Sequence, residues 1–437
     1  MVSNMGRNMS GIVHAALRLA RKLRQAPMAV KVPLALMLLA AVPLARAAEP
    51  LRTPVKQQDE SPKGSLLIAG GAVRGDNAVI WQRMVQLAGG SGARIAVLPS
   101  ASGNPARAGA YLVAGLNKYG AAAFVVPIAV KMKERDYRRD AEDETLAASI
   151  RDAGGVYFSG GDQALITQAL VRPDGTRTAV LEAIWDVYRR GGVIAGTSAG
   201  AAIMSSTMFY DAKTVFGTLS EGVNGRELAT GLGFIGDDIF VDQHLLARGR
   251  FARMLPAMLK KGYKLGIGID ENSAVIITGR RHVEVVGYQG ALLVDLARAK
   301  VDPKVKDFNL SNVRLSYLDR DDRYDLATHK YTPSADKIEG KVDPKKPYLK
   351  EPVYSTDVLG HNTILILMSK LVDNSETQAI GIATAGPLDP RQDLGFEFKL
   401  TRDAGTTGYS SATMDAYTVL DMRLDVRPLQ VTRPWYK

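Results

Sequence analysis

Short apolar runs alternate with longer helical stretches between residues 64 and 200 of this 437-residue chain. The apolar runs have the length of strands and lie at 65–69, 94–98, 123–126, 156–158 and 193–195. Alternation of this kind predicts a three-layer α/β domain with a mainly parallel central sheet. Ligands of such sheets bind beyond the carboxyl ends of the strands. The loops that follow these runs should therefore surround one pocket, and they include 70–71, 99–100, 160–161 and 196–198.

The sequence GGVIAGTSAG at 191–200 places a serine at the bend between the fifth strand and the next helix. Gly196 and Gly200 flank Ser198 in a G-x-S-x-G pattern. Small neighbours let the backbone turn sharply there and raise the hydroxyl above the sheet edge. Ser198 is thus a candidate nucleophile, although the same pattern also occurs in tight loops where a serine caps a helix.

A serine nucleophile needs a base, and the base needs an acid to orient it. His244 follows a strand predicted at 239–241, so it lies at a strand end as Ser198 does. Glu271 closes a strand predicted at 266–269, and the three side chains should meet at one sheet edge. The order serine, histidine, acid differs from that of α/β-hydrolases, where the acid precedes the histidine. The remaining histidines are His14, His282, His329 and His361.

Backbone amides are the expected donors to the oxyanion of an acyl-transfer reaction. The N–H of Ala199 directly follows the candidate nucleophile, and the Gly160–Gly161 turn lets the backbone approach a substrate oxygen. We therefore expect Gly161 and Ala199 to form an oxyanion hole.

Composition excludes several classes of protein. The chain contains no cysteine, which removes thiol nucleophiles, disulfides and Cys-based metal sites. Nothing in the sequence calls for a metal or an organic cofactor. The formal net charge is +11, but residues 1–47 hold seven basic and no acidic residues, which leaves +4 for the rest. We therefore expect no nucleic-acid partner.

Residues 1–47 have the pattern of a secretory signal peptide. A long basic start precedes an apolar stretch at 32–44, and Ala45-Arg46-Ala47 fits a cleavage site. The apolar stretch is short for a membrane span, although an uncleaved anchor is the alternative. After cleavage we expect a secreted protein, extracellular or periplasmic, without stable membrane association, and a flexible polar leader at 48–63.

The composition changes after Tyr331 to a stretch rich in Lys, Pro and Asp. We therefore predict a catalytic domain at 64–330 and a C-terminal extension of unknown role at 331–437. A helix is expected at 362–371 and strands at 396–400 and 419–427. Within the catalytic domain, one long helix is expected between the turn at 159–163 and Arg190.

Five motifs together carry a family resemblance that extends over 64–326. They are GGDQ at 160–163, GTSAGAA at 196–202, GLGF at 231–234, DQHLLARGRFARM at 242–254 and GIGIDENSA at 266–274. In this set and order the chain resembles the cyanophycinases, serine peptidases distantly related to peptidase E and to class I glutamine amidotransferases. The resemblance implies the flavodoxin-like fold of those amidotransferases, while the missing cysteine excludes their activity.

The resemblance further implies hydrolysis of cyanophycin, a polyaspartate that carries arginine on each side-chain carboxyl, to β-Asp-Arg dipeptides through an acyl-enzyme. It makes Ser198 the nucleophile, His244 the base and Glu271 its acid. Relatives are commonly homodimers, and the leader resembles that of the extracellular type. The substrate-pocket positions of the family match Gln163, Asp242, Gln243, Arg248, Arg250 and Arg253.

The three arginines agree with a carboxylate-bearing substrate, because guanidinium groups bind carboxylates in bidentate fashion. A solvated basic helix face is the alternative interpretation. Two other functions remain open: a peptidase E type aspartyl or isoaspartyl dipeptidase, and an inactive exported protein that binds the polymer.

Overall fold

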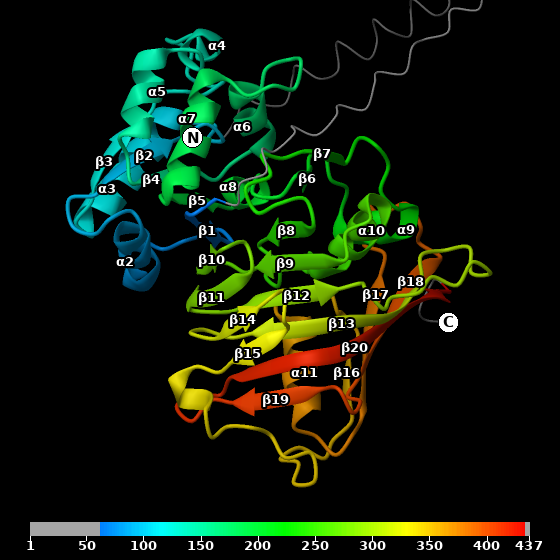
Figure 1. Ribbon diagram of the computed structural model, residues 1–437. Coiled ribbons are helices and arrows are strands. Elements are labelled where there is room, and N and C mark those ends of the chain that lie inside the picture. The colour runs from blue at the N-terminus through cyan, green and yellow to red at the C-terminus, as the bar shows by residue number, and fades with distance from the viewer. Residues whose placement is uncertain (1–61, 433–437) are drawn as a thin grey trace, which may run out of the picture. The chain divides into compact units, whose positions relative to one another are not determined.

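The computed structural model describes residues 62–432 (Figure 1). The predicted signal peptide at 1–47 and nearly all of the predicted leader at 48–63 lie outside the described residues.

The first of two large sheets begins with the strands predicted from the alternating pattern. Strands run in the order β3–β2–β4–β5–β1, and every pair in this half is parallel. The bounds are β1 (Ser65–Ala69), β2 (Arg94–Leu98), β3 (Ala122–Val125), β4 (Gly155–Phe158) and β5 (Val193–Thr197).

The same sheet continues beyond β1 in antiparallel fashion, in the order β10–β11–β14–β15. These strands are β10 (Ser273–Thr278), β11 (His282–Gly287), β14 (Arg323–Asp325) and β15 (Lys330–Thr332). The sheet is therefore mixed, and the prediction of a mainly parallel sheet holds for one half only. Short hairpin turns join β10 to β11 and leave no room for the crossover helix that a parallel pair needs.

Helices cover both faces of the parallel half, which gives the expected three layers. Residues along β1 alternate between two cores: Leu67 and Ala69 pack with α2 and α3, whereas Leu66 and Ile68 pack with α5, α6 and α7. The helices are α2 (Ala78–Leu87), α3 (Pro105–Lys118), α4 (Tyr137–Asp140), α5 (Glu144–Arg151), α6 (Gln163–Leu170) and α7 (Ala179–Arg190).

The single long helix predicted before Arg190 is wrong, because α6 and α7 are separate helices. Pro173, Asp174 and Gly175 form a turn between them, and Val171 forms a bridge with Arg177. Proline lacks the N–H that a continuing helix would need. Thr178 then caps α7 by accepting a hydrogen bond from a backbone N–H of its first turn.

The second sheet also contains nine strands and was not anticipated as a separate sheet. Its order is β16–β17–β18–β20–β13–β12–β9–β8, with β19 beside β20. The strands are β8 (Ile239–Gln243), β9 (Leu265–Ile269), β12 (Ala291–Asp295), β13 (Leu310–Leu318), β16 (Val353–Ser355), β17 (Gln378–Thr384), β18 (Leu394–Thr401), β19 (Thr407–Ser410) and β20 (Tyr417–Gln430).

The C-terminal segment contributes five of the nine strands of this second sheet. The predicted helix is α11 (Thr363–Val372), and the two predicted strands are β18 and β20. β20 pairs with β13, and the ring of Phe398 on β18 lies 5.7 Å from that of Phe251. Residues on both sides of the predicted boundary at 330 therefore share one sheet and one core.

Smaller elements lie between β5 and β9. They are α8 (Ala199–Ala202), β6 (Thr207–Phe209), α9 (Val215–Glu221), β7 (Leu228–Thr230) and α10 (Phe251–Lys261). The strands β6 and β7 pair only with each other, and α9 and α10 pack into the core of the second sheet.

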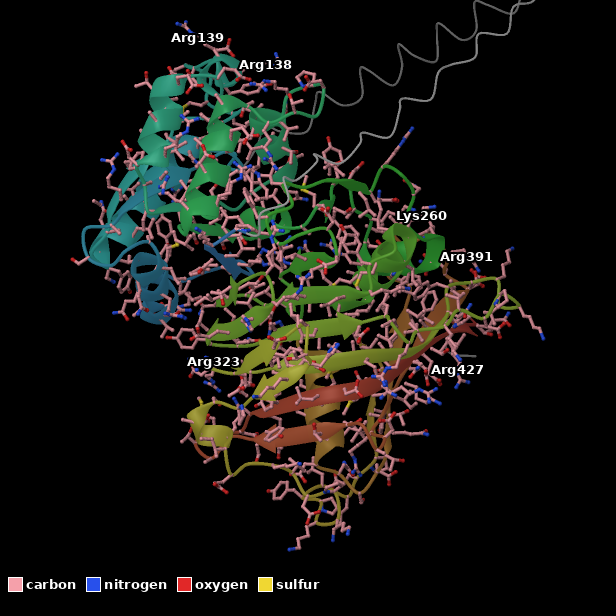
Figure 2. All side chains as sticks on the ribbon, in the orientation of Figure 1. Arg138, Arg139, Lys260, Arg323, Arg391 and Arg427 are labelled. Carbon is pink, nitrogen blue, oxygen red and sulfur yellow. The ribbon has the colours of Figure 1, made fainter. Side chains whose placement is uncertain are left out.

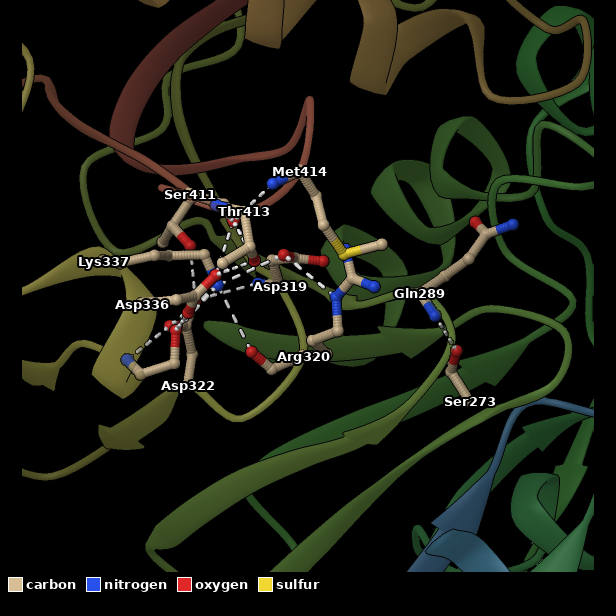
Figure 3. Close-up of polar contacts among 12 residues, drawn as sticks. Ser273, Gln289, Asp319, Arg320, Asp322, Asp336, Lys337, Ser411, Thr413 and Met414 are labelled. Atoms are coloured by element: carbon tan, nitrogen blue, oxygen red, sulfur yellow. Dashed lines mark hydrogen bonds and ion pairs between the residues drawn. The ribbon is translucent and has the colours of Figure 1, made fainter. Parts of the chain in front are cut away.

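Lys337 ends a short 3-10 helix, η1 (Ala335–Lys337), and anchors the chain after β15. Its ammonium is fully buried, 3.1 Å from Asp319 Oδ2 and 3.4 Å from Asp322 Oδ1, and it donates to Ser334 Oγ (Figure 3). Two carboxylates thus compensate a buried positive charge. This cluster ties the C-terminal segment to the turn between β13 and β14.

Basic side chains are spread over separate elements. The residues labelled in Figure 2 include Arg139 on α4, Lys260 on α10 and Arg427 on β20. Among residues 62–432, no helix is long and apolar enough to cross a membrane.

Candidate active site

Ser198 occupies a sharp turn between β5 and α8. Its backbone has φ +54° and ψ −109°, a conformation rarely adopted by residues other than glycine. A Cβ at Gly196 would lie 2.2 Å from the Gly200 carbonyl oxygen, and one at Gly200 would lie 2.6 Å from that of Phe158. Both flanking positions therefore require glycine, because the chain folds back closely on itself. The N–H of Ser198 donates to Ala69 O at 3.0 Å, which ties the turn to β1.

His244 directly follows β8 and also has a left-handed backbone, with φ +51°. Its N–H donates to Gly70 O at 2.8 Å. The imidazole lies against Gly71, where a Cβ would be only 2.2 Å from His244 Cε1. Glycine at 71 therefore makes room for the ring. His244 Nε2 lies 2.8 Å from Ser198 Oγ.

Glu271 lies on the connection from β9 to β10, and its Oε1 is 2.6 Å from His244 Nδ1. The structure thus brings hydroxyl, imidazole and carboxylate into one hydrogen-bonded chain. Such a chain can activate a serine for nucleophilic attack, since the imidazole accepts the hydroxyl proton and the carboxylate stabilises the resulting cation.

The sequence predicted that the three side chains meet at the edge of a single sheet. Instead, they meet between the two sheets. Ser198 follows β5 of the first sheet, and His244 follows β8 of the second. Glu271 lies where the chain passes from β9 of the second sheet to β10 of the first.

Two backbone amides lie near Ser198 with their hydrogens uncommitted. Among residues 62–432, neither Gly161 N–H nor Ala199 N–H donates to another residue. Ala199 opens α8, where first-turn amides lack intrahelical partners. A Cβ at Gly161, where φ is +139°, would lie 2.0 Å from Ala101 O. Glycine is therefore required at this position, and Gly161 lines the pocket in front of Ser198.

The pocket beside Ser198 has a volume of about 310 Å³. Of the residues predicted from the sequence, it is lined by Gly161, Gln163, Ser198, Gln243, His244, Arg248, Arg250 and Arg253. Four further lining residues were not predicted from the sequence: Phe209, Tyr210, Ala212 and Lys213. None of the described lining residues carries a carboxylate, so the pocket walls are cationic.

Residues 65–285 match the model of peptidase family S51. The chain belongs to peptidase family S51. It is a serine-type peptidase, and the resemblance to cyanophycinases drawn from the five motifs is confirmed.

Relatives of this S51 peptidase include a cyanophycinase of Geminocystis herdmanii, 33% identical over 282 residues, which cover 61% of this chain and 95% of the relative. A cyanophycinase of Synechococcus elongatus is 32% identical over 285 residues, covering 62% of this chain and 82% of the relative. Among solved structures, a peptidase from an acI-B1 actinobacterium is 21% identical with a TM-score of 0.42, over 53% of this chain and 90% of that chain.

The surroundings of His244 in this S51 peptidase favour the neutral form of its imidazole. His244 is 6% exposed, and burial lowers the pKa of its imidazole. The hydrogen bond to Glu271 acts in the opposite direction, while the charges of Arg248 and Arg250 lower the pKa further. A neutral imidazole can accept a proton from Ser198 near neutral pH.

Asp242 was predicted in the substrate pocket, but its side chain is buried and does not line the pocket. Its carboxylate forms a buried bidentate pair with Arg253, with two contacts of 2.7 Å. The Arg253 guanidinium also lies 4.1 Å from the centroid of the Phe209 ring. Asp242 thus neutralises Arg253 and reduces the like charge that three neighbouring arginines would otherwise concentrate.

The cations facing the pocket differ in how far they are compensated. Arg250 Nη1 donates to Gln243 O and Oε1, both at 3.0 Å, and these oxygens are neutral. Burial, with a contribution from Arg253, lowers the pKa of Arg250 to about 10, so it stays charged near neutral pH. Arg248 has a half-exposed side chain with Glu271 at 3.6 Å. Lys213, in contrast, pairs with two glutamates, at 2.7 Å and 3.0 Å.

No group of three or more His, Asp or Glu side chains that could hold a metal ion occurs within residues 62–432.

Proposed function

We propose that this S51 peptidase hydrolyses cyanophycin to β-Asp-Arg dipeptides through an acyl-enzyme on Ser198. The observation that carries the proposal is the hydrogen-bonded chain Ser198–His244–Glu271 beside a pocket walled by cations. The name cyanophycinase, borne by relatives that this chain covers almost completely, supports the choice of polymer.

In the proposed reaction, Ser198 Oγ attacks the carbonyl carbon of the scissile backbone amide while its proton passes to His244 Nε2. Glu271 stabilises the imidazolium that forms. The N–H groups of Gly161 and Ala199 donate to the oxyanion. His244 then returns the proton to the leaving amine, and the C–N bond breaks. Water, deprotonated by His244, cleaves the ester and restores the serine.

The positive charge of the pocket walls supports an anionic substrate. In cyanophycin each arginine is attached through its α-amine, so its α-carboxylate stays free at every repeat. We propose that Arg250 and Arg248 bind such carboxylates, because the described contacts leave them less compensated than Lys213 or Arg253. Gln163 and Gln243 offer amide groups to the polar backbone of the substrate.

Purified protein incubated with cyanophycin should release β-Asp-Arg, detected by mass spectrometry. Ser198→Ala should abolish release, whereas Ser220→Ala, which removes a hydroxyl on α9, should not. Product formation by the Ser198→Ala variant would contradict the mechanism.

Two assays separate the other candidate functions. Faster cleavage of α-aspartyl dipeptides than of cyanophycin would indicate a peptidase E type dipeptidase. A protein that binds the polymer, yet is not labelled by a fluorophosphonate at Ser198, would be an inactive binding protein.

We also propose that the protein is exported by residues 1–47 and acts in the periplasm or outside the cell. The support is the basic start, apolar stretch and small-residue site of that segment. N-terminal sequencing of the exported protein should begin at Ala48, and a membrane-retained chain that keeps residues 1–47 would contradict this.

A further inference from the structure

The C-terminal segment touches the loop that carries the proposed base. We call residues 244–250, between β8 and α10, the base loop, because it holds His244, Arg248 and Arg250. The family match ends at residue 285. Residues 359–362, which precede α11, lie far beyond that match and nevertheless contact the base loop directly.

Two contacts join these segments. The N–H of Asn362 donates to Leu246 O at 3.0 Å. Gly249 has φ +59°, and a Cβ there would lie 2.3 Å from Leu359 O. The backbone of Leu359 therefore packs so closely on the base loop that position 249 accepts only glycine.

The opposite side of the base loop is held by the S51 part of the chain. Asp270 Oδ1 accepts hydrogen bonds from Leu246 N–H at 3.2 Å and from Ala247 N–H at 3.0 Å. Leu246 thus donates its N–H to Asp270, and its carbonyl accepts a hydrogen bond from Asn362. The loop is clamped between Asp270 and residues 359–362.

The segment that contains residues 359–362 is itself held by the second sheet. The N–H of Val358 donates to Ile382 O on β17 at 2.9 Å. β17 in turn pairs with β18, which pairs with β20. A chain of strand pairings therefore links this segment to β13 and so to the β8 strand that precedes His244.

We propose that residues 359–362 are a positioning element of the active site, which holds the base loop so that His244 stays buried against Ser198. The proposal rests on the proposed role of His244 as the base, but not on the identity of the substrate. Residues 359–362 touch no reacting atom and act through the base loop alone.

The direct test is Gly249→Ala in the full chain, with Gly262→Ala as the matched control. Both glycines have a left-handed φ, but a Cβ at Gly262 meets nothing within 4 Å. Gly249→Ala should lower the rate of Ser198 labelling by a fluorophosphonate about tenfold or more. Gly262→Ala should stay within about twofold of the parent.

The pH dependence of labelling distinguishes positioning from a general loss of stability. Burial lowers the pKa of His244, and Glu271, Arg248 and Arg250 are the charged groups that face it. A loosened base loop lets water reach the His244 ring, which raises its pKa towards the ordinary value. The acid limb of the labelling rate, plotted against pH, should therefore move to higher pH in Gly249→Ala and remain in place in Gly262→Ala.

A second pair of variants, at Asn362, covers the case in which Gly249→Ala does not fold. Asn362 has φ +57°, which valine adopts poorly and glycine readily. Asn362→Val should therefore slow labelling and shift the acid limb, whereas Asn362→Gly should do neither. Folded Gly249→Ala or Asn362→Val protein with parental rate and pH profile would overturn the proposal. Labelling reports this independently of the substrate, so failure to hydrolyse cyanophycin would contradict the proposed function only.

Discussion

Ser198 and His244 both have a positive φ, +54° and +51°, which residues other than glycine rarely adopt. Such a conformation costs about 1–3 kcal/mol at each residue and persists only where the surroundings enforce it. Here the surroundings are the buried strands β5 and β8 and the hydrogen bonds to Ala69 O and Gly70 O. We interpret the two strained turns as the feature that directs hydroxyl and imidazole toward each other.

Glu271→Gln tests the charge behind the imidazole. Glutamine keeps an oxygen near His244 Nδ1 but cannot stabilise the imidazolium, so kcat should fall roughly 10²–10⁴-fold. Glu284→Gln, which removes a carboxylate paired with Arg83, should leave kcat unchanged. Steady-state kinetics on cyanophycin measures both, and unaltered kcat in Glu271→Gln would contradict the role of the acid.

The pH dependence follows from the lowered pKa of His244. The imidazole must be unprotonated to accept the serine proton, so activity is lost as pH falls through its pKa. Because burial lowers that pKa, the acid limb of kcat/KM should lie below the ordinary histidine value of about 6.5. Arg248→Gln removes a nearby positive charge and should move the limb upward. An acid limb above pH 7 in the parent would contradict this assignment.

The lining residues that the sequence analysis missed carried no readable signal. Phe209 ends β6, and Tyr210 and Lys213 lie between β6 and α9, without a motif and without periodicity. Asp242 was placed in the pocket because it matches a substrate-pocket position of the cyanophycinase family. Side chains alternate along a strand, so a residue of β8 beside Gln243 faces the opposite way and meets Arg253 instead.

At the scale of elements, the parallel half of the first sheet was predictable because its strands are short, mainly apolar runs and helices separate them. The second sheet was not predictable in the same way. β8 and β9 read as further strands of the first sheet, since short apolar runs do not reveal which sheet they join. β17 has the sequence QAIGIAT, whose internal glycine weakens the signal of a strand.

Lys337→Met tests the buried cluster that joins η1 to the β13–β14 turn. Without the ammonium, the buried Asp319 and Asp322 lose their compensating charge. The free energy of unfolding should fall by about 3–5 kcal/mol. Lys330→Met on the exposed β15 should change it by less than about 0.5 kcal/mol. Denaturant titration compares them, and equal stability of the two variants would show that the cluster contributes little.

Over the whole described chain, the candidate active site is assembled where two nine-stranded sheets meet. Ser198 comes from the first sheet, His244 from the second, and Glu271 from the connection between them. The C-terminal strands extend the second sheet, which explains how residues beyond 353 reach the base loop. The three residues could be predicted from the sequence around each of them. Their arrangement between two sheets could not, because that arrangement depends on pairings between strands that are distant in sequence.

The central claim is that one serine, activated by His244, performs the hydrolysis. Titration with a fluorophosphonate while β-Asp-Arg release from cyanophycin is followed tests it most directly. We predict one covalent group per chain, on Ser198, and product release that falls in proportion to its occupancy. Full occupancy of Ser198 with undiminished release of β-Asp-Arg would contradict the account.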